Sequence, residues 1–250
     1  MTRSQLATST LGDIVSRDFR AGAILDRYGL DYCCGGTRSL VEGCSQQGIG
    51  LETVLSDLEA LDSGEREPFE DDPAALVDYI VSRHHAYVRA SIPAIQQHLA
   101  KVVDAHAVRH SELRLVEREF SSVARELLLH MVKEEQVLFP YISALVDAVR
   151  SDGPPPPDMF GTVQNPIRMM EIEHQEAGDG LSAIRELTCG YEPPADACGT
   201  YRLVLEELKA FEFDLHTHVH LENNVLFPKA VELESKVGHT TRGLKMPACE

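Results

Sequence analysis

The sequence is short of basic side chains and has no long hydrophobic run. Lysine and arginine number 23 against 40 aspartates and glutamates, which gives a formal net charge of -17. A surface of this sign repels phosphate backbones and anionic lipids, so we expect neither nucleic acid nor a membrane as partner. No stretch reaches the roughly 20 apolar residues of a transmembrane helix, and residues 1–11 lack the apolar segment of a signal peptide. We therefore expect a cytoplasmic protein.

Cysteine is also scarce, and its pattern gives no reason for structural disulfides. A chain of this length can bury a core without covalent links, and cytosolic thiols are kept reduced. Besides the adjacent pair Cys33 and Cys34, four cysteines have no partner at motif spacing: Cys44, Cys189, Cys198 and Cys249. We expect mostly reduced thiols and assign no role to these four.

Strand-like segments are missing, and a charged run divides the helical part in two. Residues 62–72 have no hydrophobic period and predict a solvated boundary. Before it, residues 1–62 should form a small domain of three or four helices, with an N-terminal cap at Thr10. After it, residues 73–235 should form the main domain, and residues 236–250 a tail.

The main domain should contain four long helices. Each has apolar residues at steps of three and four along one face, and helices of this kind bury a shared face best as a bundle. The expected helices run from Asp72-Pro73 onward, over 111–149, from Asn165-Pro166 onward, and over 197–234. The predicted fold class is an all-α four-helix bundle with a small N-terminal helical domain.

One motif occurs twice in the bundle. Residues 130–140 recur as residues 218–228, matching at His, Glu, Val, Leu, Phe and Pro with identical spacing, 88 residues apart. A histidine precedes each copy on a helix of its own: His85 lies 45 residues before the first copy and His174 lies 44 before the second. The bundle is thus two similar hairpins, each offering two histidines and a glutamate.

These side chains lie on the face that should be buried. His130 and Glu134 continue the apolar series 120–127, and His218 and Glu222 continue the series 211–215. Histidine and glutamate four apart on a helix project from the same face. Because a buried carboxylate without a partner is strongly disfavoured, the two pairs require a cation.

Four imidazoles and two carboxylates exceed the needs of one tetrahedral metal ion, and a carboxylate can bridge two metals. We therefore predict a dinuclear site. The predicted set places His85 and His130 on one metal, His174 and His218 on the other, and Glu134 and Glu222 as bridges. The Leu-Phe-Pro end of each motif is interpreted as helix punctuation and core packing, which positions the site without binding metal.

The other histidines are expected to lie outside the site. His84 competes with its neighbour His85, and the spacing of the repeat mildly favours His85. His216 and His220 lie about 200° around the helix from His218 and should face solvent. The remaining histidines are expected at the surface: His98, His106, His110 and His239.

The adjacent thiols Cys33 and Cys34 precede Gly35-Gly36, which permits an unusual turn and the close approach of another group. A disulfide between adjacent cysteines would be strained and readily reduced. The pattern therefore suits redox chemistry or transient contact with a metal. The alternative, that the thiols are small buried apolar groups, is equally compatible with the spacing.

Together these motifs resemble the iron-sulfur cluster repair di-iron proteins, the RIC family, over residues of about 6 to 232. The resemblance rests on four runs: Asp31-Tyr-Cys-Cys-Gly-Gly36, His130-Met-Val-Lys-Glu-Glu-Gln136, Glu173-His-Gln-Glu-Ala-Gly178 and Leu221-Glu-Asn-Asn-Val-Leu-Phe-Pro228. It implies a hemerythrin-like bundle, a non-haem di-iron centre with an oxo or hydroxo bridge, and His85 rather than His84 as ligand. Family ligands match at the other five predicted positions. The set has no fifth histidine, unlike oxygen-carrying hemerythrins, which argues against reversible oxygen carriage.

The resemblance also implies a function in the response to nitrosative or oxidative stress. The protein would repair damaged iron-sulfur proteins by giving up iron, with Cys33 and Cys34 helping the transfer, rather than act as a classical enzyme. One alternative is a di-iron reductase of nitric oxide or peroxide. Another is a hemerythrin-like sensor that binds NO or O2. The sequence does not separate repair from reduction, and we leave a homodimer open.

Overall fold

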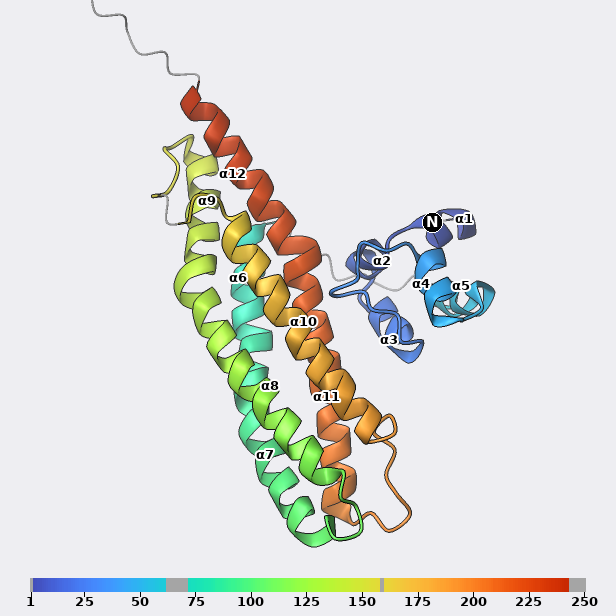
Figure 1. Cartoon of the computed structure of the whole chain (residues 1–250). Helices are drawn as coiled ribbons and strands as arrows, with labels where there is room; N and C mark the ends of the chain where they lie inside the picture. The colour runs from blue at the N-terminus through green and yellow to red at the C-terminus, as the bar shows by residue number, and fades with distance from the viewer. Residues whose placement is uncertain (1, 62–71, 158–159, 243–250) are drawn as a thin grey trace, which may run out of the picture.

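The computed structural model describes residues 2–61, 72–157 and 160–242, and every regular element in these ranges is helical (Figure 1). The all-α prediction is confirmed. Most of the predicted boundary and Cys249 lie outside the described residues. Within those ranges, no helix combines the length and the apolar character needed to cross a membrane.

The N-terminal unit contains five short helices, not three or four. They are α1 (Arg3–Thr8), α2 (Leu11–Arg17), α3 (Arg20–Arg27), α4 (Leu40–Gln47) and α5 (Leu51–Glu59). As expected, Thr10 caps α2, and its hydroxyl accepts a hydrogen bond from the Asp13 N–H at 3.1 Å. Helix α1 was not predicted, since it is only six residues long and buries none of them.

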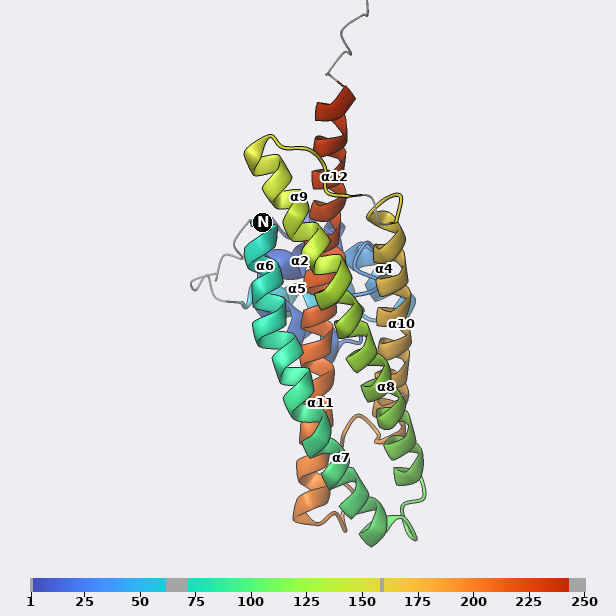
Figure 2. The same ribbon diagram turned by 90° about the vertical axis from the view of Figure 1, so that its left-hand side faces the viewer.

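The bundle is built of four helical rods that run along one another (Figure 2). Three of the rods change locally to π-helix, labelled η. The rods comprise α6 (Pro73–Tyr79), η1 (Ile80–His85) and α7 (Ala86–His106); α8 (Leu113–Lys133), η2 (Glu134–Leu138) and α9 (Phe139–Ser151); α10 (Gln164–Leu187); and α11 (Gly199–Leu221), η3 (Glu222–Leu226) and α12 (Phe227–Arg242). The last rod continues into the predicted tail.

The π-helical turns η2 and η3 lie in the two copies of the repeated motif. In η2 the N–H of Phe139 bonds to the carbonyl of Glu134, and in η3 the N–H of Phe227 bonds to that of Glu222, each five residues back. A proline follows each phenylalanine and cannot donate to the preceding turn. One extra residue is thus accommodated in the turn, as in other π-turns at functional sites. The Leu-Phe-Pro ends are register changes within continuous rods.

The buried residues of the bundle form two large apolar clusters. One surrounds Phe120 and Phe211 and extends into the N-terminal unit. The other surrounds Phe139 and Phe227 in the half of the bundle that contains α6, α9 and α12. Buried histidines and glutamates lie at the level where the π-turns occur, between the two clusters. The core is therefore apolar, then polar, then apolar along the bundle axis.

The N-terminal unit packs against α11 and η3, which overturns the expectation for two histidines (Figure 1). His220 is fully buried, with its Nε2 3.2 Å from the Ser16 hydroxyl. His216 pairs with Asp26 at 2.8 Å. Both side chains point away from the face that carries the predicted ligands, as the helical period predicts. The face on which they lie is covered by the N-terminal unit and does not face solvent.

His106 was also expected at the surface and is instead buried, with 7% of its area exposed. It lies at the end of α7 against Tyr201, their ring centroids 5.4 Å apart. His98 and His110 are half-buried and paired with carboxylates. The side chain of His239 is outside the described set.

Residues 31–36, called the cysteine loop below, approach η3 closely, and this approach gives a test of the packing. A Cβ at Gly36 would lie 2.5 Å from the backbone oxygen of Tyr32 and would also meet the Asn224 amide. We expect Gly36→Ala to lower the unfolding free energy by about 1–3 kcal/mol and to weaken hydrogen-exchange protection over residues 31–36. Gly178→Ala is the control, since a Cβ there meets no atom within 4 Å and should be neutral or stabilising. Equal effects of the two substitutions would contradict the described contact.

Candidate metal centre

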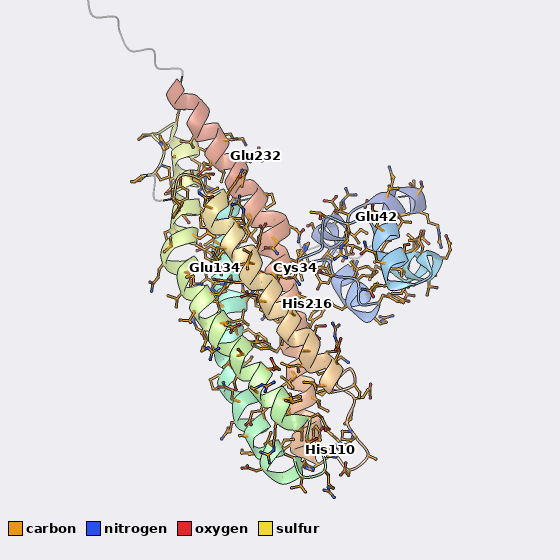
Figure 3. All side chains as sticks on the ribbon, in the orientation of Figure 1. Cys34, Glu42, His110, Glu134, His216 and Glu232 are labelled. Carbon is orange, nitrogen blue, oxygen red and sulfur yellow. The ribbon has the colours of Figure 1, made fainter. Side chains whose placement is uncertain are left out.

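All six predicted ligands converge in the interior of the bundle. His85 ends η1, while Glu134 and Glu222 begin η2 and η3 one turn after His130 and His218. His174 lies in the middle of α10, which has no π-turn. No ligand exposes more than 2% of its area. Figure 3 shows Glu134 in the bundle, at about the same height along it as Cys34.

The ligands form two groups that share both carboxylates. One group is His85, His218, Glu134 and Glu222; the other is His130, His174, Glu134 and Glu222. Within the groups, the Nε2 atoms of His85 and His218 are 3.1 Å apart, and those of His130 and His174 are 3.0 Å apart. The predicted pairing of His85 with His130 and of His174 with His218 is therefore wrong. Each group takes one histidine from each hairpin, because α7 packs on α11 and α8 packs on α10.

Three of the four imidazoles are oriented by an acceptor on their outer nitrogen. The Nδ1 of His85 lies 2.6 Å from a Glu135 oxygen, and that of His130 lies 2.9 Å from a Glu173 oxygen. The Nδ1 of His174 lies 2.9 Å from the amide oxygen of Asn223. An acceptor here fixes the tautomer that leaves Nε2 free to bind metal. Such partners accompany metal-binding histidines and were not predicted from the sequence.

The repeat gives a signal that could have identified two of these acceptors. Glu135 and Asn223 occupy the same place in the two motifs, directly after the shared glutamate, and each serves the histidine of the preceding rod. The phenylalanines of the motifs match in the same way. Phe139 stacks on His85 with centroids 5.7 Å apart, and Phe227 stacks on His174 at 6.1 Å. They position imidazoles, as the sequence interpretation held.

His84 is buried too, but it faces away from both groups. Its Nδ1 lies 3.1 Å from Asp214, and its ring stacks on His218 with centroids 5.6 Å apart. When the two hairpins are aligned, with His85 matched to His174, His84 occupies the position of Glu173. Since a histidine replaces that carboxylate, the Nδ1 of His218 is buried without a hydrogen-bond partner among the described residues.

The two carboxylates control the charge of the cluster. Burial opposes the charged form of His85, but the nearby carboxylates of Glu134 and Glu222 raise its pKa to about 10. Burial also opposes protonation of His130, and the same carboxylates raise its pKa to about 9. His218 is the exception, because desolvation lowers its pKa. A metal bound between these side chains would compete with the protons of His85 and His130.

The donor set fits a pair of metal ions. Both Glu134 oxygens are buried without a hydrogen-bond partner among the described residues, and its Oε2 lies 3.3 Å from His130 Nε2 and 3.4 Å from His85 Nε2. A carboxylate with imidazole nitrogens on two sides is placed to share itself between two cations. Mixed nitrogen and oxygen donors suit iron, zinc or manganese.

The cysteine loop lies next to this cluster, on the face of the N-terminal unit turned toward the bundle (Figure 3). One carboxylate oxygen of Asp31 accepts hydrogen bonds from the backbone N–H groups of Cys33 and Cys34, and the two sulfurs are 3.8 Å apart. Asp31, Cys33 and Cys34 form a third group able to hold a metal ion. Cys33 is buried and Cys34 partly exposed.

Asn223 joins the cysteine loop to the metal ligands. Its amide nitrogen donates to the Cys33 carbonyl at 3.3 Å, while its oxygen faces the His174 Nδ1. Asn224 also donates to the Cys33 carbonyl, at 3.0 Å. A cavity of about 150 Å³ borders both thiols together with Gln175 of α10. The backbone of Cys33 is therefore linked through one side chain, Asn223, to the predicted ligand His174.

A four-rod bundle with buried histidines and shared glutamates defines the hemerythrin class of metal proteins. Residues 76–230 match the model of the hemerythrin HHE cation binding domain, and residues 7–62 match ScdA_N, a domain of unknown function. The chain belongs to the iron-sulfur cluster repair branch of this class, as its similarity to curated relatives shows.

Those relatives are bacterial and are similar over almost their whole length. The iron-sulfur cluster repair protein YtfE of Escherichia coli O157:H7 is 33% identical over 226 residues, which cover 88% of this chain and 96% of the relative. The YtfE proteins of Shigella boydii serotype 4 and of Enterobacter sp. strain 638 are 32% identical over the same shares. The resemblance found in the motifs is thereby confirmed.

Substitution of the adjacent histidines His84 and His85 of η1 distinguishes a metal ligand from a residue that only packs. We expect His85→Ala to lose most of the bound iron, because its Nε2 faces the shared carboxylates. His84→Ala should keep the iron but lower the unfolding free energy by about 1–3 kcal/mol, since it removes a buried side chain bonded to Asp214. Iron content and thermal unfolding of both variants are the measurements. The reverse ranking of iron content would overturn the assignment of the ligand.

Proposed function

We propose that this protein repairs damaged iron-sulfur clusters by donating iron from a di-iron centre held by His85, His130, His174, His218, Glu134 and Glu222. The observation that carries the proposal is the sharing of both buried carboxylates between two histidine pairs, with a cysteine loop packed beside them. The names of the relatives support repair over the reductase and sensor alternatives.

The ligand residues would hold two irons, and their two carboxylates would offset part of the metal charge. When bound, iron provides coordination positions that the six side chains do not fill. The acceptors Glu135, Glu173 and Asn223 keep three imidazoles turned inward. Protonation of His85 and His130 offers a way to release the cargo, because two protons restore the charge balance when a metal leaves.

In this proposal Cys33 and Cys34 receive the departing iron. The pKa of Cys33 is raised well above its ordinary value by the hydrogen bond between Cys33 and Cys34 and by burial. Cys33 is therefore a thiol until a metal displaces its proton. Cys34 is the more exposed of the two and borders the cavity. Asp31 adds an oxygen donor to the pair. Transfer would then continue to an apo iron-sulfur protein.

We further propose that the protein works in the cytoplasm, where its five described cysteines, all free, are kept reduced. The boundaries near residues 62–72 and 235 stay predictions, as does the small N-terminal domain as an independent unit. The partners in this proposal are damaged iron-sulfur proteins.

The dinuclear site predicts about two irons per chain after anaerobic loading. Glu222→Leu should lower this to about one or fewer while the bundle stays folded, because an apolar side chain fits the buried position better than an unpaired charge. Elemental analysis and circular dichroism are the measurements. Glu206→Leu, on the exposed face of the same helix, is the matched control. Saturation of the unchanged protein near one metal would refute the dinuclear proposal.

Iron donation is tested with the double variant Cys33→Ala, Cys34→Ala. The iron-loaded protein is mixed anaerobically with an apo-ferredoxin-type acceptor and sulfide, and cluster formation and iron loss are followed together. We expect the double variant to keep its iron and to transfer it at least about tenfold more slowly, since the receiving thiolates are missing.

The control for that experiment is Cys189→Ala, which removes an exposed thiol far from the cysteine loop in the sequence. Transfer as fast as in the unchanged protein would show that Cys33 and Cys34 take no part. Loss of iron from the double variant would make them ligands of the resting centre. No transfer by the unchanged protein would contradict the proposed function itself.

A further inference from the structure

A second cysteine site lies at the end of the bundle formed by the α7–α8 and α10–α11 connections. His110, which Figure 3 labels, marks this end, well away from Glu134. Cys198 directly precedes α11, and His106 occupies the last position of α7. Neither residue belongs to the proposed metal centre or to the cysteine loop.

The two side chains form a cysteine–histidine pair. The Sγ of Cys198 lies 3.2 Å from the Nε2 of His106, within hydrogen-bond distance for sulfur. His106 is more than nine-tenths buried, and Tyr201 packs against its ring. Its other nitrogen, Nδ1, is buried without a partner among the described residues. The imidazole is therefore fixed in place with one nitrogen aimed at an exposed thiol.

The sulfur lies at a helix N-terminus, beside two histidines. Cys198 is the N-cap residue of the 23-residue helix α11, and its side chain makes no capping hydrogen bond. The N–H groups of the first helical turn present partial positive charge at this position. Hydrogen bonds with Asp196 and Glu112 raise the pKa of His110. Its ring centroid lies 6.3 Å from that of His106. The nearby carboxylate of Asp196 is itself paired with His110 and Arg109.

We propose that Cys198 is a peroxide-reactive thiol, activated by His106, and that it is a site of reversible sulfenylation. The thiol proton passes to His106 Nε2, and the thiolate attacks the terminal oxygen of a small hydroperoxide. An S–O bond forms while the O–O bond breaks. The sulfur gives up two electrons and becomes a sulfenic acid, and the leaving hydroxide or alkoxide takes the proton from His106. One low-molecular-weight thiol condenses with the sulfenic acid to a mixed disulfide and water, and a second thiol then releases Cys198 as the thiol and leaves as the low-molecular-weight disulfide.

Cys189 offers an internal control. It is exposed like Cys198 and lies in the same connection, but no histidine is within hydrogen-bond distance of its sulfur in the described structure. The full-length, iron-loaded protein is pulsed with iodoacetamide at neutral pH, and each thiol is quantified by peptide mass spectrometry. We expect Cys198 to react at least about tenfold faster than Cys189. After hydrogen peroxide, dimedone should label Cys198 and leave Cys189 almost unlabelled.

His106→Asn keeps a polar group near the place of Nδ1 and removes the base, because its side chain is too short to reach the place of Nε2. In this variant the reaction rate of Cys198 should fall about tenfold, to that of Cys189, while iron content stays unchanged. Equal rates for the two thiols in the unchanged protein would refute the proposal, and so would a rate that does not respond to His106→Asn. If the variant does not fold, the ratio of the two thiols in the unchanged protein decides. Dimedone labelling confined to Cys33 or Cys34 would also overturn it.

Discussion

Two carboxylates held out of water set the conditions for the rest of this molecule. Glu134 and Glu222 are fully buried, and a charge in that position is tolerated only beside compensating charges and hydrogen-bond donors. Four imidazoles provide that surrounding, and they must point inward from all four rods. The π-turns, the stacked phenylalanines and the acceptors on the outer nitrogens are the means by which the bundle holds them there.

The same constraint determines where the N-terminal unit can rest. The turn that begins at Glu222 also presents Asn223 and Asn224, which hold the Cys33 carbonyl. A side chain that orients a metal-binding histidine therefore also anchors the cysteine loop. This shared turn makes the position of the thiols depend on the geometry of the ligands, although the two lie in parts of the chain nearly 200 residues apart in the sequence.

The four rods could be predicted because they follow from local periodicity. The six inward-facing histidines and glutamates could be predicted from the same periodicity and from the repeat within the chain. The pairing of His85 with His218 could not, since it depends on which rods become neighbours after folding. The prediction that His216 and His220 face solvent was wrong for a related reason. Helical period places them opposite the ligands, but it does not tell whether solvent or another unit covers that face. The prolines at 140 and 228 were the only sign of the π-turns η2 and η3, and η1 had no such sign.

The division of the core by a polar layer has a consequence for how the bundle unfolds. Two large apolar clusters, one around Phe120 and one around Phe139, meet at a plane of charged and polar groups. At this plane histidines and glutamates lie between the clusters inside the bundle, and Phe19 of the N-terminal unit packs against both clusters. Metal bound by the histidines and glutamates would thus connect the two halves of the bundle into a single cooperative unit. Removal of the metal would let the half that contains α9 and α12 open separately from the half that carries α7 and α8.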